Sequence, residues 1–400
     1  MSSPPTAVAD PLDFLQEELT SLVRRGLYRS LREQAGEPAG SVAIGGRKVI
    51  LLCSNNYLGL ATHPWVKEAA KQAIDTYGAG SGASRLVSGN SELYQELEER
   101  LARLKGTEAA IVFASGYAAN VGTISALVGR RDAVYCDRLN HASIYDACLL
   151  SRADIKRYPH GDTASLERLL RNSPIRGKRL IVSDGVFSMD GDIAPLMELV
   201  RLAEEYSAIL MVDDAHGTGV LGDNGAGTVA HCGLEGRVPV QMGTLSKALG
   251  GLGGFVAGSQ TLVNYLVNKA RPLIYSTALP PPVLASCVAA LNVLEQEPQL
   301  QNKLAENAVF LRQGLFGLGF CVLNSQTPII PVVIGDPHLT MQASEALLEE
   351  GVFVQGIRPP TVPEGKARLR VTVMATHKRE ELSRALEAFG RVGRRLGLIR

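Results

Sequence analysis

Ile209-Leu210-Met211-Val212-Asp213-Asp214-Ala215-His216 is an apolar run that ends in two carboxylates and a histidine. The run predicts a buried strand. In an open α/β sheet, ligands lie beyond the carboxyl ends of the strands. An aspartate buried there is costly unless a cation or hydrogen-bond donors face it. We therefore expect Asp213 to face a positively charged ligand group, although a helix cap or a surface turn would use the same residue types.

Strand-like and helix-like segments alternate on both sides of this run. Buried-strand patterns occur at 109–114, 133–136, 179–183, 238–242 and 254–257. Helical patterns lie between them at 117–128, 143–150 and 195–206. Such alternation with apolar strands is typical of a mostly parallel, doubly wound sheet with helices on both faces. The sequence therefore predicts an α/β protein.

The same patterns divide the chain into three parts. Residues 1–50 are predicted to form a helix, over 12–35, and a short strand segment. Residues 51–285 form the large domain that holds the sheet. The composition changes after three consecutive prolines, and helical and short-strand patterns predict a smaller α+β domain over 286–400.

Composition excludes several classes of protein. Apolar residues make up 46% of the 400, which is too many for a disordered chain. The 41 Lys and Arg residues nearly cancel 40 Asp and Glu residues, so no electrostatic footprint for nucleic acid or an anionic membrane is present. The first residues lack a secretory pattern, and none of the six cysteines forms a C-x-x-C pair. We expect a cytoplasmic protein without a metal site.

A second chemical signal follows the predicted strand at 238–242. Gly243-Thr244-Leu245-Ser246-Lys247-Ala248-Leu249-Gly250-Gly251 places a single lysine in a glycine-rich, otherwise apolar stretch. Desolvation lowers the pKa of a lysine and makes its amine available for Schiff-base chemistry. A lone lysine after a strand is often a surface residue, but the apolar setting and the strand-end aspartate favour a reactive amine.

Three further strand ends carry polar groups. Ser115-Gly116-Tyr117 opens an uncharged helix whose first N–H groups can receive a phosphate. Asn140-His141 and the 183–192 loop, which includes Ser188, follow two other strands. Each is also compatible with an ordinary turn. Together with Asp213 and Lys247, however, they supply the parts that hold pyridoxal phosphate (PLP).

The motifs resemble those of the α-oxoamine synthases, PLP enzymes of the fold type I, aspartate aminotransferase-like class. The resemblance covers about residues 20 to 390. It rests on the following stretches, in this order along the chain: Asn55-Asn56-Tyr57-Leu58-Gly59-Leu60, GAGSGASRLVSG, Asn140-His141-Ala142-Ser143, VFSMDGD, DDAHGTG and GTLSKALGG.

The resemblance implies a role for each matching residue. Lys247 carries the cofactor as a Schiff base, and Lys247, Asp213 and His141 are the catalytic residues. The implied cofactor contacts are Gly116, Tyr117 and Thr244 at the phosphate, His141 on the ring, Ser188 and His216 near the phenolic oxygen, and Asp213 at the pyridine nitrogen. A homodimer with shared active sites is also implied, in which Ser276 and Thr277 reach the neighbour's phosphate. The substrate side would contain Arg29, Asn55 and Arg370, with Arg370 on the amino-acid carboxylate.

Within that family, Ile357-Arg358-Pro359-Pro360-Thr361-Val362-Pro363 and the DAHGTG form of the aspartate motif look like the biotin-pathway branch. That branch condenses L-alanine with a pimeloyl thioester, carried by coenzyme A or acyl carrier protein, with loss of carbon dioxide. The alternative is 2-amino-3-ketobutyrate coenzyme A ligase, which joins glycine and acetyl coenzyme A. A non-catalytic partner subunit is a third reading, which the presence of Lys247 disfavours.

Overall fold

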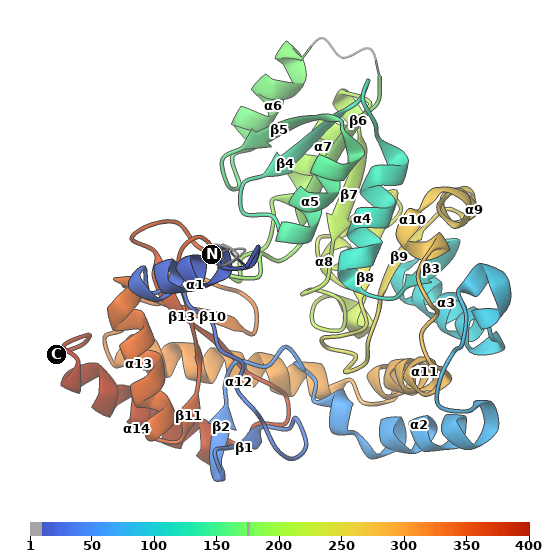
Figure 1. Ribbon diagram of the computed structural model, residues 1–400. Coiled ribbons are helices and arrows are strands. Elements are labelled where there is room, and N and C mark those ends of the chain that lie inside the picture. Colours follow the sequence, from blue (N-terminus) through green and yellow to red (C-terminus); the bar gives the residue numbers. More distant parts are fainter. Residues whose placement is uncertain (1–9, 174–176) are drawn as a thin grey trace, which may run out of the picture.

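Seven strands form the central sheet of the larger part of the molecule (Figure 1). Their spatial order is β3 (Ala109–Phe113), β9 (Gly254–Gly258), β8 (Val240–Thr244), β7 (Ile209–Asp213), β6 (Arg179–Asp184), β4 (Ala133–Asp137) and β5 (Asp154–Tyr158). The last five run parallel, and β9 is antiparallel to both of its neighbours. The computed structural model describes residues 10–173 and 177–400.

Helices cover both faces of this sheet. Leu180 and Val182 of β6 pack into a cluster under one set of helices, whereas Ile181 between them packs into a cluster on the other face. The first set contains α4 (Gly116–Leu127), α5 (Ala142–Ser151) and α9 (Gln260–Lys269), and the second α6 (Thr163–Asn172), α7 (Leu196–Glu205) and α8 (Thr228–His231). This alternation explains why the strands read as continuous apolar runs. The predicted doubly wound α/β architecture is confirmed.

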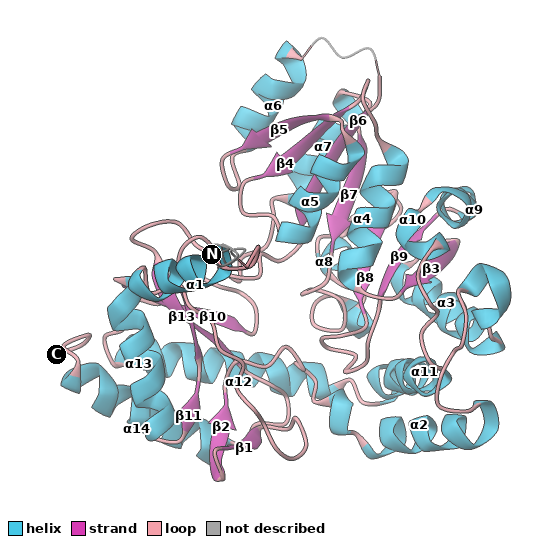
Figure 2. Ribbon diagram, in the orientation of Figure 1, coloured by secondary structure: helices cyan, strands magenta, loops and turns pink. Residues whose placement is uncertain are grey.

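The C-terminal part contains two small sheets (Figure 2). One has the order β10 (Ile329–Gly335), β13 (Ala367–Thr372), β12 (Gln355–Ile357), with all pairs antiparallel. In the other, β1 (Ser41–Ile44) and β2 (Arg47–Leu51) join β11 (Val352–Phe353). The associated helices are α12 (Gln299–Gly317), α13 (Pro337–Glu349) and α14 (Arg379–Arg395). The N-terminal strands therefore belong with the C-terminal part.

The expected division at 285/286 falls inside one helix. That helix, α11 (Pro281–Gln296), packs on α2 (Pro64–Tyr77) and α3 (Glu92–Lys105), which belong to the larger part. Most of α11 is buried, so its apolar sequence reflects a place inside the core. Structurally, α11 lies with the larger part, and the C-terminal elements begin at α12.

The predicted helix over 12–35 is wrong in its length. The helix α1 spans only Phe14–Arg24 and ends in a Schellman motif, in which the Leu27 N–H donates to the Leu22 carbonyl at 2.8 Å. Gly26 supplies the left-handed conformation, with φ of +63°, that this motif requires. No regular element follows over 27–34.

Several elements were not predicted: the strands β5 and β12 and the helices α6, α8, α9, α10 (Arg271–Ile274) and α13. The strand β5 is polar, with Lys156 and Arg157 in its centre, because it lies at the edge of the sheet. Edge strands do not need an apolar run on both faces. The helix α6 follows it.

The expectation of a missing secretory signal applies to residues 1–9. These residues lie outside the part of the chain that the structure describes. Within residues 10–173 and 177–400, no helix combines the length and apolarity needed to cross a bilayer.

Candidate active site

The site lies where the parallel strands of the large sheet end. The register pairs Asp184 at the end of β6 with Asp213 at the end of β7, and Asp213 with Met242 in β8. Two residues further along β8 is Thr244, which precedes Lys247. The polar strand ends that the sequence shows separately are therefore neighbours in the sheet.

Asp213 is buried and held by N–H donors. Its residue is 3% exposed, Asn120 Nδ2 of α4 donates to its Oδ2 at 2.7 Å, and the Ala215 N–H donates to its Oδ1 at 3.0 Å. Among residues 10–173 and 177–400, no lysine, arginine or histidine forms an ion pair with it. A buried carboxylate without a cation suits a positively charged group of a ligand, such as a protonated pyridine nitrogen.

A second buried carboxylate stands beside Asp213. Burial, and next the charge of Asp213, raise the pKa of Asp184 well above its usual value. Its Oδ2 accepts the His141 N–H at 2.7 Å, which fixes the start of α5. Burial thus favours the neutral form of Asp184, beside the Asp213 carboxylate.

Lys247 begins a chain of hydrogen bonds. Its Nζ lies 2.9 Å from Nε2 of His216, and Nδ1 of His216 lies 2.7 Å from the Tyr57 hydroxyl. Burial is the main factor that lowers the pKa of Lys247 to about 8, and burial also lowers that of His216 well below its usual value. A neutral His216 accepts from the amine through Nε2 and donates through Nδ1 to Tyr57. The lowered pKa leaves part of the amine in its free-base form near neutral pH.

The N-terminus of α4 provides an anion cradle. Ser115 caps the helix, because its Oγ accepts the Ala118 N–H at 3.0 Å. The N–H groups of Gly116 and Tyr117 lack a partner among the described residues, and such groups bind phosphate. A Cβ on Gly116 would lie 3.2 Å from Met242 Cε and 3.5 Å from Thr244 Oγ1, so Thr244 borders the same cradle. Amine, carboxylate and cradle together fit PLP.

Arg370 of β13 forms the opposite wall. Its Nε donates to the Ser188 carbonyl at 2.6 Å, and both terminal nitrogens lie 3.2 Å from Oδ1 of Asn55. Asn55 also accepts from the Tyr57 hydroxyl at 3.3 Å, which links this wall to Lys247 through His216. Both terminal nitrogens of Arg370 make only long hydrogen bonds, to a single amide oxygen. A carboxylate can therefore replace Asn55 and bind the two nitrogens with its two oxygens.

Three expected residues are not in this hydrogen-bonded cluster. Arg29 lies in a separate pocket beside β12. Ser276 and Thr277 make no hydrogen bond to Lys247 or its partners within the described residues, and Thr277 is exposed and bridged to Ser84. Ser188 contributes its carbonyl to the cluster.

Sequence reasoning missed three residues of the site. Asn120 is the one amide on the uncharged helix α4, one turn after Gly116, and this was a usable signal. Tyr57 and Asp184 stood inside quoted motifs without a role. Both gain their partners from segments far away in the sequence, which no local pattern reveals.

Comparisons with known proteins agree on one family. A family model described as aminotransferase class I and II matches residues 47–389. An 8-amino-7-oxononanoate synthase of Citrifermentans bemidjiense is 55% identical over 385 residues, covering 96% of this chain and 99% of that protein. The serine palmitoyltransferase of S. paucimobilis, solved with a PLP–myriocin aldimine, has a TM-score of 0.92 at 35% identity and covers 98% of this chain and 100% of that chain. An 8-amino-7-oxononanoate synthase from Francisella tularensis has a TM-score of 0.74 at 30% identity, with coverage of 86% and 97%.

Proposed function

This chain belongs to the aminotransferase class I and II family, and on that premise we propose that it is a PLP-dependent acyltransferase of biotin biosynthesis. It joins L-alanine to a pimeloyl thioester, releases carbon dioxide and the thiol, and forms 8-amino-7-oxononanoate. The observation that carries the proposal is a half-buried amine of lowered pKa, Lys247, near a buried carboxylate, Asp213, in a chain 55% identical to an enzyme of that name.

Each residue of the site has a task in this reaction. When bound, PLP supplies an electron-withdrawing ring that accepts the electron pair released at the amino-acid Cα. Asp213 would stabilise the positive charge on the ring nitrogen of bound PLP, and His141 would cover one face of its ring. Lys247 removes the Cα proton with its free amine, which the neutral His216 keeps oriented. Arg370 binds the alanine carboxylate and thereby fixes which Cα bond is activated.

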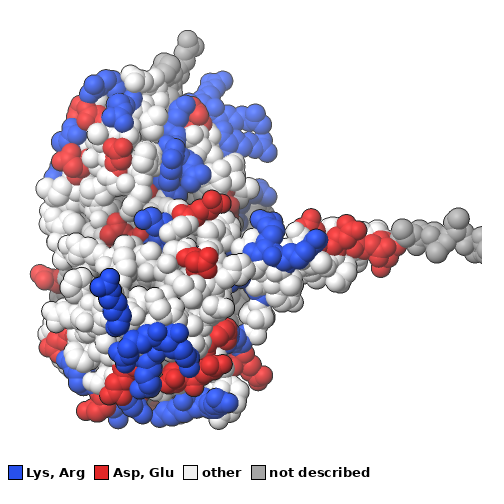
Figure 3. Space-filling model, turned by 90° about the vertical axis from the view of Figure 1, so that its left-hand side faces the viewer, with Lys and Arg blue, Asp and Glu red and all other residues white. Residues whose placement is uncertain are grey.

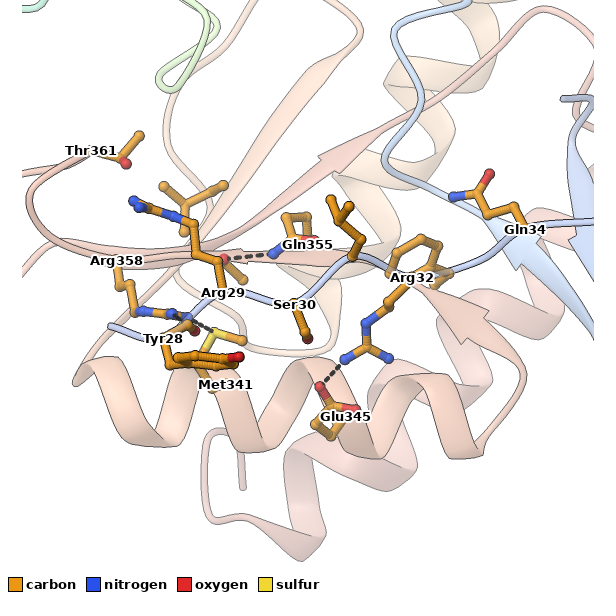
Figure 4. A pocket seen from close by; sticks show the side chains of 14 residues that line it. Tyr28, Arg29, Ser30, Arg32, Gln34, Met341, Glu345, Gln355, Arg358 and Thr361 are labelled. Carbon is orange, nitrogen blue, oxygen red and sulfur yellow. Dashed lines mark hydrogen bonds and ion pairs between the residues drawn. The ribbon is translucent and has the colours of Figure 1, made fainter. Parts of the chain in front are cut away.

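A pocket beside the Arg370 site suits the acyl chain. A cavity of about 520 Å³ lies between residues 28–34 and β12, and Gln355 on its wall faces Arg370 across the β12–β13 ladder. Figure 4 shows Arg29 and Arg358 on one side of the pocket, while Arg32 turns to Glu345. Neither Arg29 nor Arg358 has a carboxylate partner among the described residues. Two arginines without a carboxylate partner, one of them directly after the strand that neighbours Arg370, favour the free carboxylate of a pimeloyl chain.

We expect Arg358→Gln to lower kcat/KM for pimeloyl thioester by about ten- to a hundredfold, the value of a hydrogen bond to a charged group. The same variant leaves kcat/KM for heptanoyl thioester, which lacks the carboxylate, unchanged. The matched control is Arg32→Gln, which removes a cation of the same pocket that Glu345 already neutralises. Equal losses with both thioesters would show that Arg358 does not recognise the carboxylate.

The function itself is tested with two substrate pairs. Purified holoenzyme is mixed with alanine and pimeloyl coenzyme A or pimeloyl-acyl carrier protein, or with glycine and acetyl coenzyme A, and the product is identified by mass. We expect 8-amino-7-oxononanoate from the first pair. Faster turnover of the second pair would replace the proposal with the ligase activity, which differs at the amino acid by one methyl group, worth about 1–3 kcal/mol of discrimination.

A homodimer with shared active sites is part of the proposal. No residue of α1 is buried, and this arm projects from the body of the molecule (Figure 3). The exposed apolar side chains of α1 and of the turn before it include Leu12, Phe14, Leu15, Leu19 and Val23. Val87 and Tyr275, near Thr277, are exposed as well. Exposed hydrophobic surface of this kind is typical of a protein–protein interface. A second copy that covers these surfaces would bring Ser276 and Thr277 to its phosphate cradle.

A cytoplasmic location completes the proposal. All six cysteines, among them Cys53 and Cys321, lie in the described residues as free thiols. Unpaired cysteines are typical of a reducing compartment.

A further inference from the structure

His160 lies between two carboxylates outside the site described above. It follows β5, and its Nδ1 lies 3.2 Å from both oxygens of Asp137, at the end of β4. Its Nε2 lies 2.9 Å from Oδ2 of Asp192, and its ring stands edge-on to Phe187 with centroids 4.4 Å apart. The two carboxylates raise the pKa of His160 to about 10, so the ring is a cation at neutral pH.

Asp192 and Phe187 belong to a closed loop, which we call the 185–194 loop. The Ala194 N–H donates to the Gly185 carbonyl at 2.9 Å, and a bridge joins Val186 and Ile193. Oδ1 of Asp192 has no hydrogen-bond partner within the described part of the chain. The contact of Oδ2 with His160 is the one ion pair that Asp192 forms there. The cation therefore fastens this loop to the large sheet.

The tip of the same loop holds the arginines of β13. The Ser188 carbonyl accepts from Arg370 Nε at 2.6 Å, while Asp190 pairs with Arg368 at 2.7 Å. The Met189 carbonyl also accepts from Arg368, at 3.1 Å. A shift of the loop would consequently move the anchor of the Arg370 guanidinium.

We propose that the His160 imidazolium is a positioning residue for the amino-acid carboxylate site, because it ties the 185–194 loop to Asp137 and the loop holds Arg370 through the Ser188 carbonyl. The inference rests on the proposed role of Arg370. His160 touches neither substrate nor cofactor in this arrangement. It acts through the Arg370 guanidinium, since Lys247 is held by His216 and the Asp213 carboxylate by Asn120 and Ala215.

The test uses holoenzyme and the variant His160→Asn, whose amide cannot bridge both carboxylates with a charge. We expect the KM for alanine and its Kd, from spectral titration without thioester, to rise at least fivefold. The kcat at saturating alanine and the KM for pimeloyl thioester stay within twofold of the original values. Ethylamine, which is alanine without its carboxylate, binds variant and unmodified enzyme equally in the same titration.

Two further variants separate positioning from general damage. Asp192→Asn removes the partner on the loop, whose side chain is 35% exposed, and raises the KM for alanine in the same direction. The double variant adds little to His160→Asn, because both changes break one link. The matched control is His63→Asn, which removes a comparable histidine–carboxylate pair with Glu297, 3.2 Å apart, and leaves the KM for alanine unchanged.

The outcomes are distinct. An unmodified holoenzyme that gives no spectral response to alanine would overturn the proposed function. If that response is present but His160→Asn leaves the alanine KM unchanged, or weakens ethylamine as much as alanine, the positioning role is wrong. Should His160→Asn fail to fold, Asp192→Asn decides by the same two ligands.

Discussion

We expect Lys247→Ala to lower turnover by at least about a thousandfold, because it removes both the covalent attachment point and the base. A positioned base alone contributes about 10²–10⁴ in rate. Borohydride reduction of unmodified holoenzyme leaves the cofactor on the peptide that contains residue 247, and the variant takes up no label. The matched control is Lys178→Ala, at a lysine whose side chain is 53% exposed and pairs with Asp132. A label on any other peptide would contradict the assignment.

The lowered pKa of Lys247 also predicts how the binding of PLP to apoprotein depends on pH. The pKa is lowered from 10.5 to about 8, chiefly by burial. The free-base fraction in apoprotein therefore rises about tenfold per pH unit below pH 8 and levels off above it. The rate of recombination with PLP, followed by absorbance, should show this midpoint. A midpoint near 10.5 would mean that the amine is not desolvated.

The reactive groups could be predicted from sequence because each follows a strand. Asp213 ends one strand and Lys247 comes three residues after another, and parallel strands bring such ends to one edge. Asn120 and Tyr57 could not be placed in the same way. Their partners, Asp213 and His216, lie 93 and 159 residues away, and only the packed sheet joins them.

Local patterns also set the limits of the fold prediction. A continuous apolar run indicates a strand that is buried on both faces. The central strands have such runs and could be predicted, whereas the polar edge strand β5 could not. The end of α1 depends on a single glycine in the left-handed region, at residue 26, and apolar spacing continues past it. Pairing of β2 with β11 joins segments about 300 residues apart, which periodicity does not encode.

Asp213 ends β7 and Asp214 follows it, and their different partners assign them different tasks. Asp213 faces the ligand site, whereas Asp214 is enclosed in protein. Lys105 Nζ lies 2.6 Å from Oδ2 of Asp214, and neither side chain is exposed. Thr228 donates its hydroxyl to Oδ1 at 2.7 Å, and Lys105 also donates to the Ala226 carbonyl at 2.7 Å. This pair holds the end of β7 against α3 and the segment that leads into α8.

We expect Lys105→Met to lower the free energy of unfolding by about 3–5 kcal/mol, because it leaves a buried carboxylate without its cation. Urea unfolding of apoprotein measures the loss. The matched control is Lys67→Met, whose pair with Glu37 is 46% and 60% exposed and costs less than about 1 kcal/mol. Adding Asp214→Leu to Lys105→Met should recover part of the stability, since the unpaired charge is then gone. If Lys105→Met lost no more stability than the control, water or a rearranged donor would have to reach Asp214. The conclusion that Asp214 is structural and Asp213 faces the ligand would then be wrong.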